Sequence, residues 1–155
     1  MLKLTLFEFF LRIIPESILS VLAIYIFSFN RIKIKPLFMS SIFFAITTYL
    51  VRMLPIHFGI HTIIMTVIYS LIIIFINKIS IAKSISSVLL VAIFLSICEL
   101  VNMIILNLLK IDMQLEFRDS IMKVVYTTPS LVLLGGVILL FYLIVYEQKI
   151  KRIND

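Results

Sequence analysis

The sequence has few of the residues that interrupt a helix or carry a charge. Only three glycines and four prolines occur in 155 residues, so breaks within regular structure are rare. Charged residues make up 14% of the chain, against about 25% in a typical soluble domain. Cysteine occurs once, at Cys98, which excludes a disulfide within the chain. Because it lies inside an apolar run, we expect a buried structural side chain rather than a reactive thiol.

What the sequence has in excess is apolar side chains. They make up 63% of the chain, and the mean hydropathy is +1.22. A soluble domain of this size cannot hide so much apolar surface, because a small domain leaves a large part of its surface in water. Lipid is therefore the expected solvent, and the expected fold is an all-α, polytopic membrane helical bundle.

A membrane-spanning helix needs about 20 predominantly apolar residues, and the chain contains five such runs in one domain covering residues 1–155. The first run is too long for a signal-peptide core and contains Arg12 and Glu16, so we do not expect it to be cleaved. Gly135 and Gly136 in the last run indicate either close packing, the more frequent case, or a flexible point. The expected spans are residues 13–29, 37–54, 56–76, 84–109 and 122–146, followed by a cytoplasmic tail at 147–155.

The distribution of basic residues predicts the orientation. Cytoplasmic loops of membrane proteins are enriched in Lys and Arg, and an N-out, C-in topology places eight of these residues inside and four outside. We therefore expect a multi-pass protein of the inner (plasma) membrane. The net charge of +6 does not indicate nucleic-acid binding, because no soluble segment is long enough for a recognition module. The eight residues are Arg31, Lys33, Lys35, Lys78, Lys83, Lys149, Lys151 and Arg152.

On this topology, the ionisable and amide side chains within the spans fall in their outer parts. A charged side chain at the centre of a helix costs roughly 2.5–3.5 kcal/mol to insert, so such residues are expected to meet partners or water. We predict an outward-facing polar pocket in which Glu16 and Glu99 oppose Arg12 and Arg52. The candidate ligand-binding residues are Arg12, Glu16, Arg52, His57, His61, Glu99, Asn102, Tyr126 and Thr127.

Structural roles are open alternatives for the same residues. Arg12 and Glu16, spaced i,i+4, can pair simply to fix helix packing, and Arg52 can extend toward lipid headgroups from a helix end. The spacing of His57 and His61 would let them share a metal. No third ligand is identifiable nearby and the glutamate of zinc-protease motifs is absent, so we expect no metal and no cofactor.

No catalytic motif is present. The chain lacks a glycine-rich phosphate loop, a Gly-x-Ser-x-Gly elbow and a metal-binding pattern of His, Asp and Cys. A membrane enzyme using Glu99 or a histidine as a base remains an alternative, although no spacing favours it. We therefore do not expect an enzyme.

Three segments, Arg12–Glu16, Arg52–His61 and Cys98–Asn102, resemble the membrane sensor region of Gram-positive, Agr-type, peptide-sensing histidine kinases. The resemblance implies five or six helices that receive an extracellular ligand and pass a conformational change to a dimeric cytoplasmic kinase. The sequence departs from that pattern, because it ends at Asp155 with neither a phosphoacceptor helix nor an ATP-binding domain. It would then be a fragment, a stand-alone relative or a membrane protein of another kind.

Together, these features predict a sensory or regulatory membrane module that binds a small extracellular ligand or peptide. A substrate-binding subunit of a transporter and a structural protein of the envelope are the two alternatives. The expected partners are the lipid bilayer, the extracellular peptide or small molecule, and either a second copy of the chain in a homodimer or a cytoplasmic signalling protein.

Overall fold

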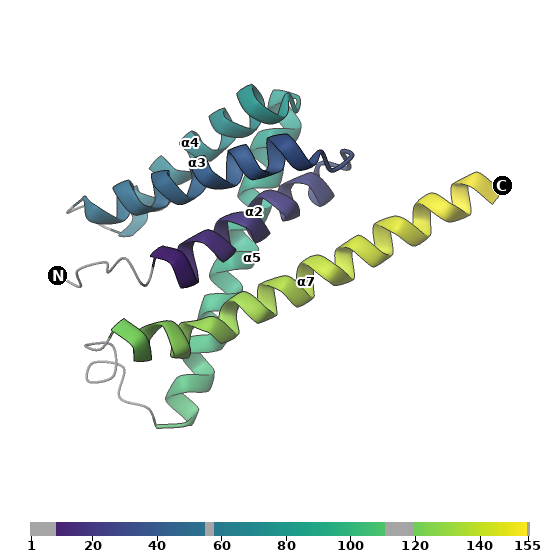
Figure 1. Cartoon of the computed structure of the whole chain (residues 1–155). Coiled ribbons are helices and arrows are strands. Elements are labelled where there is room, and N and C mark those ends of the chain that lie inside the picture. Colours follow the sequence, from purple (N-terminus) through teal and green to yellow (C-terminus); the bar gives the residue numbers. More distant parts are fainter. Residues whose placement is uncertain (1–8, 55–57, 111–119, 155) are drawn as a thin grey trace.

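The structure, a computed structural model, describes residues 9–54, 58–110 and 120–154, and this part of the chain is helical without any strand. The expectation of an all-α fold is therefore confirmed. Short connections at 28–33 and 78–80 join successive helices (Figure 1). The elements are η1 (Phe9–Ile13, a π-helical turn), α2 (Ile14–Phe27), α3 (Ile34–Met53), α4 (Phe58–Asn77), α5 (Ile81–Leu108) and α7 (Ser120–Asn154).

Four helical segments among the described residues are long and apolar enough to cross a membrane. A fifth, Thr62–Asn77 in α4, is apolar but shorter. These lengths and compositions support the expectation of a membrane protein. The four long segments are Phe9–Phe27, Ile34–Arg52, Ile81–Leu108 and Val124–Ile144.

Two helices extend beyond the spans expected from hydropathy. Helical structure is already present at Phe9, before residue 13, because the π turn η1 runs directly into α2 and includes the charged Arg12. Helix α7 continues through residues 147–154, where a tail was expected. No glycine or proline follows Gly136, so nothing in the local sequence ends this helix.

Helix α2 lies at the centre of the molecule. It contacts α3, α5 and α7, and half of the apolar segment Phe9–Phe27 is buried, against 22% of Ile81–Leu108 in α5. Helix α3 packs against it and α4 packs against α3 and α5, while the C-terminal part of α7 extends away from the other helices (Figure 1). This central position places the side chains at the start of α2 within reach of three helices.

Aromatic side chains from different helices pack against one another. Phe44 of α3 is fully buried and stacks on Tyr69 of α4, with 3.7 Å between the ring centroids. On the other side of α2, Phe27 contacts Phe94 of α5 and Phe141 of α7 at centroid distances of 5.5 and 5.1 Å. Because lipid chains are as apolar as these side chains, such packing contributes through close van der Waals contact rather than through escape from water.

The two adjacent glycines of α7 do not mark a close helix crossing. A Cβ atom added at Gly135 or at Gly136 would meet nothing within 4 Å. The packing role expected as the more frequent case is therefore wrong for this part of the structure. The two glycines therefore act on α7 through the backbone, because glycine is the least favourable residue in a helix interior after proline.

The end of α2 has a Schellman motif with an unfavourable residue at its centre. The Phe29 N–H donates to the Ile26 carbonyl and the Asn30 N–H to the Tyr25 carbonyl, both at 3.1 Å. Phe29 has a φ of 55°, in the left-handed region where glycine is preferred, and its side chain is exposed.

We expect Phe29→Gly to raise the free energy of unfolding by about 1 kcal/mol, because it removes this backbone strain. Thermal unfolding in detergent micelles measures the change. Phe38→Gly is a matched control, since Phe38 is also exposed but lies within α3; it should lower stability by about 1 kcal/mol. A loss of stability in both variants would contradict the strain at Phe29.

Candidate functional site

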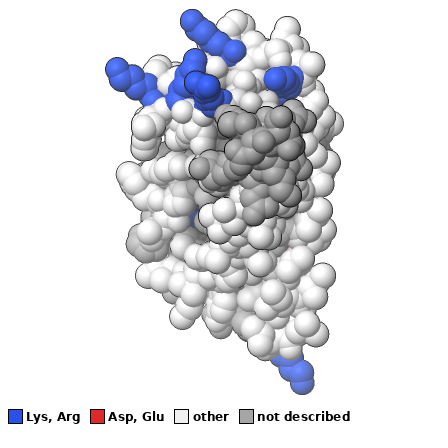
Figure 2. All heavy atoms as spheres, turned by 90° about the vertical axis from the view of Figure 1, so that its right-hand side faces the viewer, with Lys and Arg blue, Asp and Glu red and all other residues white. Residues whose placement is uncertain are grey.

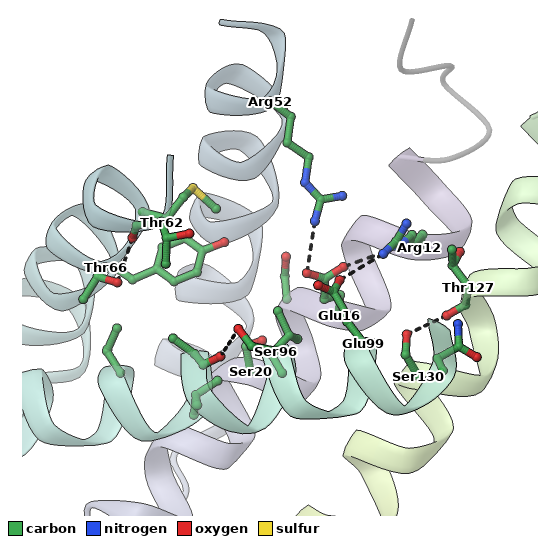
Figure 3. Close-up of a pocket in the computed structure, with 18 of the residues that line it drawn as sticks. Arg12, Glu16, Ser20, Arg52, Thr62, Thr66, Ser96, Glu99, Thr127 and Ser130 are labelled. Atoms are coloured by element: carbon green, nitrogen blue, oxygen red, sulfur yellow. Dashed lines mark hydrogen bonds and ion pairs between the residues drawn. The ribbon is translucent and has the colours of Figure 1, made fainter. Parts of the chain in front are cut away.

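Four charged side chains from four elements meet near the start of α2. We call Arg12 of η1, Glu16 of α2, Arg52 of α3 and Glu99 of α5 the charged network (Figure 3). Arg12 Nη2 donates to Glu99 Oε1 at 3.1 Å, and Arg52 Nη2 donates to Glu16 Oε1 at 3.3 Å. Arg12 Nε lies 3.8 Å from Glu16 Oε2. The network thus has two cations and two anions and no formal net charge.

The local sequence explains how these side chains meet. Arg12 and Glu16 lie one turn apart on the same helical face. Helices α2 and α3 are joined by a short connection and pack side by side, so the last turn of α3, which carries Arg52, lies near the start of α2. Glu99 is supplied by α5, which crosses α2 in this region (Figure 3).

The four side chains differ in accessibility, and the difference indicates different roles. The Glu16 side chain is 11% exposed and makes ion pairs with both arginines. The Glu99 side chain is 34% exposed and, among the described residues, pairs only with Arg12. Glu16 is therefore the internal anchor of the network, whereas Glu99 has carboxylate surface left for another molecule.

The charged network borders a cavity of about 570 Å³. Its lining comes from η1, α2, α3, α4, α5 and α7, and it combines the charged network with hydroxyl groups and aliphatic side chains. Thr62 and Thr66 of α4 lie across the cavity from the network (Figure 3). The aliphatic wall contains Ile24, Val88, Val91, Ala92, Leu95 and Leu106.

Several polar atoms at the cavity have unused hydrogen-bonding capacity. Arg12 Nε, Glu16 Oε2 and Asn102 Oδ1 are buried without a hydrogen-bond partner. The amide nitrogen of Asn102 donates to the Tyr126 carbonyl at 2.9 Å, which fixes the side chain and leaves its oxygen free. Arg12 Nε and Glu16 Oε2 face each other at 3.8 Å, too far apart for a hydrogen bond, whereas Asn102 Oδ1 has no partner among the described residues. Buried polar groups are normally satisfied, so these atoms indicate a place for a polar molecule.

The part of α7 that borders the cavity contains a proline within the helix. Pro129 has no N–H, so it leaves a carbonyl one turn earlier without its helical donor. Nearby hydroxyls donate to the backbone: Thr128 to the Val124 carbonyl and Ser130 to the Thr127 carbonyl, each at 2.7 Å. Neither of these two bonds reaches the Val125 carbonyl, which lies four residues before Pro129, so the proline makes this a point where α7 can bend.

The structure places most of the predicted site residues together. Arg12, Glu16, Arg52 and Glu99 form the charged network, and Asn102 and Thr127 also line the cavity.

Tyr126 takes part through its backbone carbonyl and does not line the cavity. His57 lies outside the described residues, and His61 lies in α4 but its side chain is also outside the described part.

Several residues that line the cavity were not predicted from the sequence. Thr62, Thr66 and Tyr69 of α4 form one wall, and Ser20 and Ser96 contribute hydroxyls from α2 and α5. The spacing of the α4 residues, i, i+4 and i+7, indicates one helical face. Single hydroxyls within apolar runs usually bond to their own helix, as Thr66 does to the Thr62 carbonyl at 2.8 Å, so the sequence did not distinguish a wall from an ordinary span.

No known protein family matches the chain, and neither the curated proteins nor the solved structures compared with it include a significant match.

Proposed function

We propose that this chain is a five-span, N-out and C-in protein of the inner (plasma) membrane that senses a small amphipathic molecule. The molecule, a short apolar peptide in the first instance, would bind in the cavity beside the charged network. Its binding would change the position of α7 and thereby signal to a partner protein. The convergence of four charged side chains from separate helices on a cavity with an aliphatic wall is the observation that carries this proposal.

The charge distribution supports the orientation. The connections at 28–33 and 78–80 and the adjacent first turns of α3 and α5 carry exposed basic side chains and no acidic residue. Figure 2, which faces these connections, shows Lys and Arg side chains gathered there. Basic loops favour the cytoplasmic side, so the charged network at the other ends of α2 and α3 would face outward. The five basic residues are Arg31, Lys33, Lys35, Lys78 and Lys83.

The composition of the cavity supports a peptide-like ligand. The charged network has no formal net charge, so it does not select a strongly anionic or strongly cationic molecule. Asn102 Oδ1, an acceptor without a partner among the described residues, matches the N–H of a peptide backbone, and the Arg12 guanidinium supplies donors for a backbone carbonyl. The aliphatic wall matches apolar side chains, as in most small-molecule sites. The resemblance to peptide-sensing kinases points to the same class of ligand.

Helix α7 is the element that would transmit binding. Thr127 and Ser130 line the cavity, and the helix then continues past the other helices to Asn154 (Figure 1). Pro129 and the two open glycines that follow it give this helix points of lower rigidity. Signalling would require two arrangements of α7 that differ in affinity for the ligand.

A cavity-filling substitution tests ligand binding without removing a charge. We expect Ala92→Phe, which extends a ring from the cavity wall, to weaken binding of short, end-blocked apolar peptides by about tenfold or more, a change of about 1.4 kcal/mol. Microscale thermophoresis with the full chain in nanodiscs and a panel of such peptides measures the affinity. Ala82→Phe is the matched control, because Ala82 is exposed on the same helix outside the cavity.

Two outcomes would contradict the proposal. One is that no peptide of the panel binds the unaltered chain, and the other is that Ala92→Phe and Ala82→Phe bind equally well. Accumulation of a bound peptide inside sealed vesicles would favour the transport alternative over sensing.

A further inference from the structure

A second, smaller pocket lies at the end of the bundle opposite the charged network. It has a volume of about 220 Å³ and is formed by the last residues of α2 and α4 and the connections that follow them. Of the described residues that line it, Ile79 is the only aliphatic one. Its polar lining residues are Tyr25, Asn30, Arg31, Lys33, Asn77 and Lys78.

Two buried side chains of this pocket lack hydrogen-bond partners. Tyr25 is 1% exposed and its hydroxyl has no partner. Asn77 is 6% exposed, and neither its amide nitrogen nor its amide oxygen has a partner. An unsatisfied buried polar group is costly, and three such atoms in one pocket indicate that a polar molecule completes the site.

The charge of the pocket defines that molecule. Arg31, Lys33 and Lys78 are exposed cations on its lining, and residues 28–36 and 77–83 contain no Asp or Glu. The negative C-terminal ends of α2 and α4 lie at this end of the bundle, but so do the positive N-terminal ends of α3 and α5. The helix dipoles therefore do not cancel the positive charge of the pocket. Arg, Lys, a tyrosine hydroxyl and an amide N–H are all donors, as a phosphate group requires.

We propose that this pocket binds a phosphate ester, with the phosphate held by Arg31, Lys33 and Lys78 and by the hydroxyl of Tyr25. The remaining acceptor, Asn77 Oδ1, would receive a hydroxyl of the same ligand. The headgroup of an anionic phospholipid with a free hydroxyl, such as phosphatidylglycerol, has this chemistry. Basic pockets between helices at the cytoplasmic side of a membrane bind such headgroups. A soluble phosphate ester shares the chemistry and is the other source of the ligand.

Binding to the purified full chain in detergent tests the proposal. The probes are short-chain phosphatidylglycerol, short-chain phosphatidylcholine, glycerol 3-phosphate and inorganic phosphate, and the readout is the dissociation constant. We expect Lys33→Gln and Lys78→Gln each to weaken binding of phosphatidylglycerol about fivefold. Lys35→Gln and Lys83→Gln remove the same charge from exposed positions at the same end but outside the pocket, and they should change it much less.

Tyr25→Phe separates a binding role from a structural one. Because the hydroxyl has no hydrogen-bond partner among the residues that the structure describes, its removal should leave thermal stability without ligand unchanged or higher, while binding of phosphatidylglycerol weakens severalfold. Binding of phosphatidylglycerol but not of glycerol 3-phosphate or inorganic phosphate would identify the lipid as the source. Binding of the soluble phosphates with the same dependence on Lys33 and Lys78 would identify a soluble ester. Equal losses in the pocket and control variants, equal affinity for phosphatidylcholine, or no binding would overturn the proposal.

Discussion

Replacing Glu16 by glutamine is expected to lower the free energy of unfolding by about 3 kcal/mol or more, because it removes the buried carboxylate that pairs with both Arg12 and Arg52. Glu16 is the anchor of the charged network: Arg52 donates to it at 3.3 Å, and Arg12 Nε lies 3.8 Å from its second oxygen. Glutamine has the same shape but no charge, so the network would pass from no formal charge to +1. Thermal or SDS-induced unfolding in micelles measures the loss.

A double variant distinguishes lost charge balance from lost packing. Glu16→Gln with Arg52→Gln removes one anion and one cation, so the remaining Arg12–Glu99 pair is again balanced. We expect the double variant to be more stable than the sum of the two single losses predicts, since residues of one network are coupled. Strictly additive losses would show that the four charges do not act as a network.

Glu99→Gln provides the control within the network. Its side chain is 34% exposed beside the cavity, and Arg12, its partner, keeps the Glu16 carboxylate 3.8 Å from its Nε atom. We therefore expect a loss of roughly 1 kcal/mol, well below that of Glu16→Gln. A loss as large as that of Glu16→Gln would contradict the division of roles between the two glutamates.

The second large loss of stability is expected from a substitution in the contact between α3 and α4. Phe44→Ala removes a fully buried ring that stacks on Tyr69, and we expect it to lower the free energy of unfolding by about 2–4 kcal/mol. This value is lower than that for phenylalanine in a soluble core. In a membrane, the exposed ring would contact lipid rather than water, so its burial gains less free energy. Tyr69 also bonds to Thr48 and lines the cavity, so the loss should extend to ligand binding.

The neighbouring residue is a matched control for this substitution. Phe43 is 48% exposed on the other face of the same helix, where only lipid would contact it. Phe43→Ala should change stability by less than about 0.5 kcal/mol. Equal effects of the two substitutions in the unfolding measurement would mean that Phe44 does not hold α3 against α4.

The charged network shows how far sequence reasoning reaches in a membrane chain. The cost of isolated charges in lipid predicted that Glu16 and Glu99 would lie opposite Arg12 and Arg52, and the structure brings these four side chains together. The individual pairs were not predictable beyond Arg12 and Glu16, since only these two are neighbours on one helix. The pairs with Arg52 and Glu99 depend on the crossing of α2 with α3 and α5.

Differences between the expected and observed elements have physical causes as well. Helical structure is already present at Phe9, before the first span expected from hydropathy, and ion pairs compensate the charge of Arg12 within it. Gly135 and Gly136 were expected to mark close helix packing more often than flexibility. The open space around both residues in the structure excludes close packing. The second pocket was missed because Tyr25 and Asn77 lie far apart in sequence and are unremarkable at the ends of apolar runs.

Access of water to the cavity from outside is the most direct test of the proposed function. Ser96 lines the cavity twelve residues before the end of α5 at Leu108, about 18 Å along the helix. In a Cys98→Ser background, we expect Ser96→Cys in intact cells to react with a membrane-impermeant maleimide, and Ile97→Cys, exposed on the outer surface of the same helix away from the cavity, to remain unmodified. Modification of Ser96→Cys only after the membrane is permeabilised, or equal modification at both positions, would contradict an outward-facing cavity.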